Sequence, residues 1–305
     1  MRLCRIGPES TPRPAFYDES RIVPLADAQR VRGQPLDDVG EDLLPLLASP
    51  QVKKLAAWVE SQEYVPGQLN HEKVELLVPI PKPNKIFLLA GNYAGHIRER
   101  GGVAAERAET FPYVFMKPNT TLNHPSKPVR IPDVSPEHID WELELAVVIG
   151  KQCKGVSETD ALNCVAGYTI VNDITNRKYR PNPNRTKREK DSFFDWLHGK
   201  WFDSFCPCGP CVVSTDEIVD PQTLPMKLTV NGKVWQNGST AQMIFPVAAL
   251  IEFISAMVTL EPGDLISTGT PAGVGNAGGT YLKPGDIVEG TITGIGTLRT
   301  SIAAQ

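Results

Sequence analysis

Short apolar runs bounded by glycine, proline or polar residues recur along most of the chain. Such runs predict buried strands, which we place at residues 21–25, 85–90, 113–116, 141–149 and 168–171. Helical patterns are fewer. Four apolar residues after Ser49-Pro50 fall at i, i+3, i+4 and i+7 and predict an amphipathic helix. A short helix is predicted over 157–167, and a longer one over 241–258 that starts or kinks at Pro246.

Turn signals divide the chain further. Asn231-Gly232 stands between alternating residues and predicts a hairpin over 226–235, because both central residues of that turn need positive φ. Two similar turns, at 260–264 and 282–286, each lead into a short strand. A proline-dense connector at 78–84 cannot continue a helix. We therefore expect a small N-terminal domain at residues 1–79 and a larger domain at residues 80–305.

Composition narrows the function classes. The 305 residues carry a formal net charge of −4, so no global basic field exists to attract nucleic acid or anionic lipid. No apolar stretch approaches the roughly 20 residues that a membrane span needs, and the N-terminal residues lack the apolar core of a secretory signal. Six cysteines without framework spacing are expected to be reduced. We expect a cytoplasmic protein, with the mitochondrion as the alternative.

Candidate chemistry begins at Glu142 and Glu144. Within a strand the period of two places both carboxylates on one face, and the apolar run that follows predicts that they are partly buried. Buried anions must be neutralised or must bind a cation, and oxygen ligands favour Mg²⁺, Mn²⁺ or Ca²⁺. Asp173, at the end of the next strand, would supply a third ligand if the two strands pair. The alternative is an exposed edge strand whose glutamates pair with lysines.

A succession of motifs in order along residues 85–299 resembles the fumarylacetoacetate hydrolase family. The motifs are Gly91–Glu99, Phe115–Pro118, Trp141–Lys151, Asn172-Asp173 with Arg177, Gly199-Lys200, Val230–Gly232, Leu260–Asp264 and Thr268–Gly275. Their number and order are more specific than any single motif. The resemblance implies an α+β, β-rich fold: a mixed β-sandwich roll with a small N-terminal α/β accessory domain, assembled as a homodimer.

The resemblance also implies a site and a reaction. Mg²⁺, Mn²⁺ or Ca²⁺ would be held by Glu142, Glu144 and Asp173, and a small 2-oxo acid substrate would bind the metal through its 2-oxo-carboxylate end. The expected reaction is hydrolysis of a C–C bond in an acylpyruvate or β-diketo acid. The alternative is decarboxylation of oxaloacetate, or isomerisation of an unsaturated 2-oxo diacid, at the same metal site.

Individual side chains acquire roles from the same resemblance. His96 would activate water and Glu99, at i+3, would orient it. Lys200 would lie near the oxyanion. Further residues would contact substrate or support the site: Lys117, Arg177, Arg180 and Thr270. Each has a plainer interpretation, since His96 could be a packed histidine, Arg177 a partner of an acid, and Lys200 a solvated residue.

Two segments depart from the family pattern or suggest other chemistry. The basic stretch 180–190 stands where many members have a shorter, glutamine-rich link. It is either a solvated loop or a lid or cationic funnel for a dicarboxylate or a larger acid. Cys206, Cys208 and Cys211 could suggest a zinc or redox site, but a second paired motif is missing and we favour buried cysteines. Residues 96–110 are predicted to form a helix or a mobile lid that closes on ligand.

Overall fold

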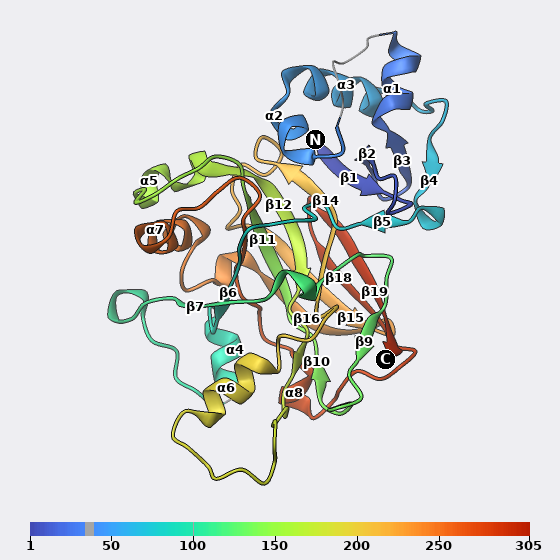
Figure 1. Cartoon of the computed structure of the whole chain (residues 1–305). Coiled ribbons are helices and arrows are strands. Elements are labelled where there is room, and N and C mark those ends of the chain that lie inside the picture. Colours follow the sequence, from blue (N-terminus) through green and yellow to red (C-terminus); the bar gives the residue numbers. More distant parts are fainter. Residues whose placement is uncertain (34–39, 100) are drawn as a thin grey trace.

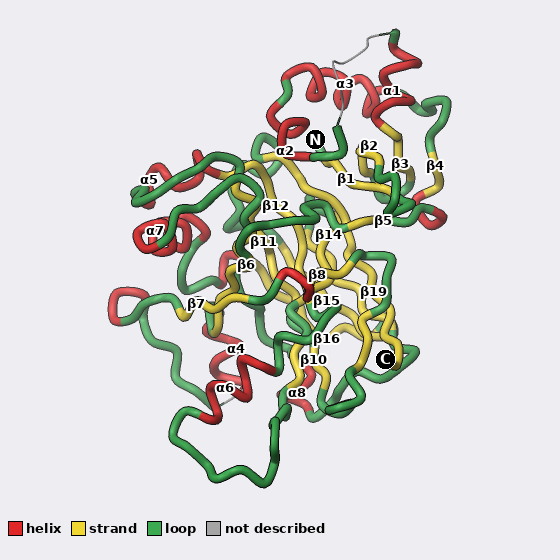
Figure 2. Tube along the Cα trace, in the orientation of Figure 1, coloured by secondary structure: helices red, strands yellow, loops and turns green. Residues whose placement is uncertain are grey.

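A computed structural model describes residues 1–33, 40–99 and 101–305, and its centre is a large mixed β-sheet with helices at the periphery (Figures 1 and 2). The strands of this sheet, in spatial order, are β4 (Leu69–Asn70), β3 (Arg21–Pro24), β2 (Arg13–Tyr17), β1 (Arg2–Ile6), β14 (Cys206–Ser214), β12 (Val165–Asn172), β11 (Leu143–Ile149), β17 (Leu265–Ser267), β6 (Ile86–Ala90) and β7 (Tyr113–Met116). Two short strands lie off this path: β5 (Leu76–Leu77) pairs with β1, and β8 (Leu122–Asn123) pairs with β14.

Two smaller sheets complete the strand structure. One contains β16 (Lys233–Ser239), β15 (Pro225–Val230), β18 (Ile287–Ile292), β19 (Gly296–Ala304) and β9 (Val129–Ile131), and the other contains β10 (Ile139–Asp140) and β13 (Thr175–Asn176). The helices are α1 (Leu25–Arg32), α2 (Leu43–Ala48), α3 (Pro50–Ser61), α4 (Ala94–Glu99), α5 (Glu158–Ala161), α6 (Asp191–His198), α7 (Val247–Met257) and α8 (Gly275–Gly278). Among the described residues, no helix has both the length and the apolar character that a membrane crossing requires. The β-rich α+β class implied by the sequence is confirmed.

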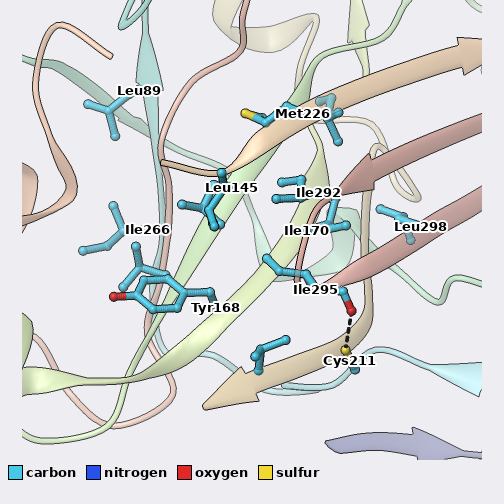
Figure 3. Close-up of a cluster of buried hydrophobic side chains, with 14 of the residues drawn as sticks. Leu89, Leu145, Tyr168, Ile170, Cys211, Met226, Ile266, Ile292, Ile295 and Leu298 are labelled. Carbon is cyan, nitrogen blue, oxygen red and sulfur yellow. Dashed lines mark hydrogen bonds between the residues drawn. The ribbon is translucent and has the colours of Figure 1, made fainter. Parts of the chain in front are cut away.

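β11 lies in the interior and contributes to both hydrophobic cores. All seven of its residues are buried, and their side chains alternate between the two faces of the sheet. Leu145 and Val147 join the core drawn in Figure 3, whereas Ala146 and Val148 join the core on the opposite face. Glu144 shares the alternation of Ala146, so its carboxylate lies on the side of the second core.

Most predicted elements are present, with shifted boundaries. α3 begins after Ser49, whose side chain caps it, and α7 starts after Pro246 rather than kinking there. The strand predicted over 141–149 begins at Leu143, because residues 139–140 pair separately as β10.

The predicted helix over 157–167 is too long. α5 ends at Ala161, a 3₁₀ turn covers Leu162–Cys164, and β12 has begun by Val165. Gly167 lies inside β12 rather than at a helix end. A Cβ at Gly167 would stand 2.2 Å from the carbonyl oxygen of Val213 on β14, so this glycine permits close strand contact.

The first 79 residues share the main sheet with the rest of the chain. β1 pairs antiparallel with β14, placing Arg2 opposite Val213, and α1, α2 and α3 lie beside these N-terminal strands (Figure 1). Residues 1–79 therefore remain a proposed accessory domain, joined to residues 80–305 by hydrogen bonds between strands.

The predicted hairpin is confirmed and yields a stability prediction. Asn231 lies in the turn of the hairpin with φ 51°. Its side chain donates a hydrogen bond to Asp286 and accepts one from the amide of Ile287. Replacing Asn231 with alanine removes both hydrogen bonds. It also places alanine, which adopts positive φ less readily than asparagine, at this position. We expect the free energy of unfolding to fall by about 1–2 kcal/mol in urea denaturation. Asn237→Ala, at an exposed position of β16, is the control and should change the free energy of unfolding little.

Candidate metal centre

Three carboxylates meet where β11 begins and β12 ends. Glu144 is on β11, Glu142 immediately precedes that strand, and Asp173 immediately follows β12. Leu143 pairs with Asn172 across the two strands, and the Asp173 amide donates to the Glu142 carbonyl at 2.9 Å. The carboxylates are buried, and one oxygen from each lies within 4.8 Å of the others. β11 and β12 therefore pair, which is the condition under which the sequence predicted Asp173 as a third ligand.

Buried cations compensate two of these carboxylates. Lys200 Nζ donates to Glu142 Oε2 at 2.8 Å and to Asp173 Oδ2 at 2.5 Å. Arg177 donates to the other oxygen of Glu142 at 2.6 Å, and Lys117 donates to the other oxygen of Asp173 at 2.7 Å. Burial alone would raise the pKa of Glu142, but the charges of Arg177 and Lys200 outweigh it and hold that pKa well below its usual range.

Glu144 differs because its hydrogen-bond donors are neutral. Its Oε2 accepts from the Ser267 hydroxyl at 2.6 Å and from the Gly269 amide at 2.9 Å. Burial, followed by repulsion from Asp173 and Glu142, raises the pKa of Glu144 to about 8. The cluster therefore carries a carboxylate that none of the described lysines and arginines pairs with.

This donor set fits a hard divalent cation. It offers oxygen atoms only, the preference of Mg²⁺, Mn²⁺ and Ca²⁺. A divalent charge would also relieve the repulsion that raises the pKa of Glu144. The surrounding donors hold each carboxylate in place, as supporting residues do around metal ligands.

The raised pKa of Glu144 predicts pH-dependent metal affinity. Below about pH 8 the metal-free carboxyl is protonated, so binding must release that proton. We expect the association constant for Mg²⁺ or Mn²⁺ to rise by up to about tenfold per pH unit from pH 6 to 8, then level off. Isothermal calorimetry in buffers of different ionisation enthalpy measures both the affinity and the proton released. An affinity that stays constant between pH 6 and 8 would contradict this assignment.

His96 and Glu99 form a pair on α4 beside the carboxylates. His96 Nδ1 lies 2.6 Å from Glu99 Oε1, and its Nε2 lies 4.0 Å from Glu142 Oε1. The other Glu99 oxygen accepts from the Gly273 amide at 2.7 Å. Glu99 is thus fixed at both oxygens, and it leaves Nε2 of His96 as the nitrogen that faces the cluster.

The segment predicted as a helix or lid is helical only in part. α4 ends at Glu99 and a 3₁₀ turn covers Arg107–Glu109, while residue 100 lies outside the described residues. Closure of this segment on a ligand remains a prediction.

Of the remaining predicted site residues, Lys117 and Thr270 lie beside the carboxylate cluster and Arg180 does not. Lys117 also donates to the carbonyls of Ile174 and Phe205, and Thr270 donates to the Leu143 carbonyl. These two side chains support the ligand strands from buried positions. Arg180 is exposed, and among the described residues no hydrogen bond or ion pair links it to the cluster.

The basic stretch 180–190 is paired with acids on the following helix. Arg185 donates to Asp191 at 2.9 Å and to Asp195 at 2.6 Å, and Arg188 donates to Asp191 at 3.1 Å. Two of its arginines are therefore neutralised by acids of α6.

The three clustered cysteines are buried along β14. Cys206 and Cys208 belong to the second core, and Cys211 belongs to the first, where it donates to the Ile295 carbonyl (Figure 3). Burial raises the pKa of Cys206 to about 12 and raises that of Cys211 above its usual range. All six cysteines of the chain are free thiols. Because Cys211 faces the other core from its two neighbours, the three thiols do not form one site.

Sequence reasoning missed Asp140, Ser267 and Gln236. Asp140 is fully buried and accepts from Arg177 Nε at 2.7 Å and from the amides of Gly275 and Asn276. Gln236 donates to Thr270, and Ser267 fixes Glu144. The period-two run of Asp140, Glu142 and Glu144 was a usable signal for the first. The roles of Gln236 and Ser267 in holding Thr270 and Glu144 are visible only from their hydrogen bonds in the folded structure.

Comparisons with known proteins agree on one family. The family described as "Fumarylacetoacetate (FAA) hydrolase C-terminal" matches residues 85–303. A 2,4-didehydro-3-deoxy-L-rhamnonate hydrolase of Sphingomonas sp. (strain SKA58) is 38% identical over 307 residues, covering 99% of this chain and 96% of that protein. A mitochondrial oxaloacetate tautomerase of Xenopus laevis is 40% identical over 232 residues, covering 75% and 69%. The solved fumarylacetoacetate hydrolase of Exiguobacterium antarcticum aligns over all of both chains with a TM-score of 0.77 and 28% identity.

Proposed function

Because this chain belongs to the fumarylacetoacetate hydrolase family, we propose that it is a divalent-metal-dependent hydrolase of acylpyruvate-type substrates. The observation that carries the proposal is the direction of His96. Glu99 occupies its Nδ1, and Nε2 lies 4.0 Å from a carboxylate of the metal-binding cluster. A base in this position reaches a water beside a substrate bound at the cluster.

A divalent cation held by Glu142, Glu144 and Asp173 would supply a Lewis acid for the 2-oxo-carboxylate end of the substrate. His96 Nε2 would take a proton from water as the water oxygen attacks the acyl carbonyl carbon. The bond between that carbon and the methylene then breaks, and its electron pair passes to the methylene carbon, which regains a proton. One acylpyruvate and one water thus give one carboxylic acid and one pyruvate.

Two other side chains support this proton transfer. Glu99 accepts from Nδ1 and stabilises the imidazolium that forms on His96. Lys200 places a fixed positive charge between Glu142 and Asp173, where negative charge accumulates when an anionic substrate arrives.

Replacing His96 with asparagine tests the assignment of the base. We expect kcat for acetylpyruvate to fall by about a hundredfold or more, while Mn²⁺ affinity measured by calorimetry changes by less than threefold. Glu99→Gln should give a smaller loss, because His96 keeps its ring but loses the charge that stabilises its protonated form. Equal rates for wild type and His96→Asn would contradict the role of His96.

The proposed reaction is tested by turnover of acetylpyruvate, fumarylpyruvate and oxaloacetate with Mg²⁺, with Mn²⁺ and with EDTA. Loss of the enol absorbance is followed, and the products are identified. Metal-dependent formation of pyruvate and the matching carboxylic acid supports hydrolysis. Turnover that persists unchanged in EDTA would overturn the metal dependence.

A second candidate is a reaction of oxaloacetate or of an unsaturated 2-oxo diacid without water. It is favoured by the 40% identity to a relative named as an oxaloacetate tautomerase. The same carboxylates would hold the cation, and His96 would move a carbon-bound proton. Tautomerisation, decarboxylation or isomerisation without formation of an acylpyruvate's acid product would establish this alternative.

The remaining features of the proposal concern the assembly and its location. We propose a homodimer that acts on a small-molecule 2-oxo acid in the cytoplasm. The mitochondrion is the alternative compartment, as in the name of the Xenopus relative.

A further inference from the structure

An apolar cleft of about 950 Å³ opens between α4, α6, β6, β7 and the C-terminal part of α7. In Figure 1, α4 and α6 lie together below β7. The inner part of the cleft is lined by Leu89, Phe115 and Trp196, and the outer part by Phe111, Phe193 and Met257. The outer residues are more than half exposed. The cleft therefore leads from solvent to an aromatic pair, in which Phe115 is buried and Trp196 is partly buried.

This aromatic pair lies against the metal-binding cluster. The rings of Phe115 and Trp196 are 4.9 Å apart at their centroids, and Lys200 Nζ lies 5.2 and 5.5 Å from those centroids. The same Nζ donates to Glu142 and Asp173. On α4, Ile97 lines the cleft while its neighbour His96 faces the carboxylates. Phe115 and Trp196 thus line the inner end of the cleft and also lie beside the lysine that binds the carboxylate cluster.

The lining has no charge of its own among the described residues. Its polar members include Asn92, Thr110 and Ser192, and the Asn92 side chain is occupied by hydrogen bonds to Phe245 and Thr268. The arginines Arg185 and Arg188, which could have bound a distal carboxylate, pair with acids of α6 and do not line the cleft. A charged substituent placed here would lose hydration and would find no counter-ion among the cleft residues that the structure describes.

We propose that the cleft takes the acyl group of the substrate, and that the preferred acyl group is apolar: a medium-length alkyl chain or a phenyl ring. This inference rests on the proposed function, because the 2-oxo acid end must bind at the carboxylate cluster for the acyl end to reach the cleft. It selects a substrate class within that function, neutral acylpyruvates over those with a second carboxylate.

A substrate series tests this preference on the metal-loaded protein. Acetylpyruvate, hexanoylpyruvate and benzoylpyruvate are compared with adipoylpyruvate, which has the length of the hexanoyl compound and a terminal carboxylate. We expect kcat/KM for hexanoylpyruvate to exceed that for acetylpyruvate at least tenfold, since each buried methylene contributes roughly a three- to fourfold gain. Adipoylpyruvate should be at least tenfold poorer than hexanoylpyruvate. Equal values across the series, or a preference for adipoylpyruvate, would overturn the inference.

Two neighbouring phenylalanines on α6 provide a matched pair of variants. Phe193 lines the cleft, whereas Phe194 does not, and both are about half exposed. Phe193→Ser should lower the hexanoyl-to-acetyl ratio of kcat/KM at least fivefold. Phe194→Ser should preserve the ratio. If both variants preserve it, the cleft does not hold the acyl group.

Binding measurements separate this inference from the proposed reaction. With Mg²⁺ present, calorimetry compares 2-oxobutanoate with 2-oxooctanoate. If acetylpyruvate is not hydrolysed but 2-oxooctanoate binds at least tenfold tighter and Phe193→Ser removes the gain, the reaction fails and the cleft assignment holds. If instead Phe193→Ser changes the mass of the assembly in light scattering and leaves the preference unchanged, the cleft is an interface with a second copy and the inference is overturned.

Discussion

Replacing Glu142 with glutamine is expected to lower metal-dependent turnover at least about a thousandfold. The amide has no charge for a divalent cation, and it also breaks the charge pairing with Arg177 and Lys200. Turnover of acetylpyruvate at saturating Mg²⁺ and the bound metal measured after dialysis both report the change. The expected loss of turnover is large because one substitution removes the charge of a candidate metal ligand and leaves two buried cations without their partner.

Glu137→Gln is the matched control for Glu142→Gln. Glu137 lies five residues earlier and its side chain is 82% exposed, so its amide variant should keep the wild-type rate and metal content. A Glu142→Gln protein that retains near-wild-type turnover at saturating Mg²⁺ would show that the carboxylate cluster is not the metal centre.

Replacing Lys200 with methionine is expected to destabilise the metal-free protein by about 3–5 kcal/mol and to reduce turnover to below 1% of wild type. The methionine leaves Glu142 and Asp173 facing Glu144 without the cation that bridges them. Urea unfolding in EDTA measures the loss of stability. Repeating it in Mg²⁺ should recover part of the loss, because the metal would replace some of the missing positive charge.

Lys178→Met controls for the removal of a lysine from the same part of the chain. Lys178 is exposed, so its replacement should alter neither the unfolding free energy nor the effect of Mg²⁺ on it. If Lys200→Met were as stable as wild type in EDTA, the bridging role of Lys200 between the two carboxylates would be wrong.

The candidate ligands could be predicted because their signal is local. Glu142 and Glu144 are two residues apart, and the strand period alone places them on one face. Asp173 needed the further assumption that successive strands pair, and the pairing of Leu143 with Asn172 confirms it. The ordered motifs indicated the family, which the match over residues 85–303 confirms, and the fold class, which the alignment with the solved hydrolase of Exiguobacterium antarcticum confirms.

Contacts between segments that are distant in the sequence could not be predicted from local sequence patterns. Lys200 follows a glycine in a loop, and its sequence suits a solvated residue as well as a buried one, yet it is 2% exposed. Its burial depends on Phe115 and Trp196, which come from a different strand and a helix. The end of α5 was misplaced for a similar reason, since Gly167 is fixed by its approach to Val213 on another strand.

The loop at residues 268–275 connects the two halves of the candidate chemistry. Its Gly269 amide holds Glu144, and its Gly273 amide holds Glu99, the partner of His96. One short stretch of backbone therefore positions both a candidate metal ligand and the carboxylate that orients the proposed base. A substitution that shifts the backbone of this loop is therefore expected to alter metal affinity and proton transfer together.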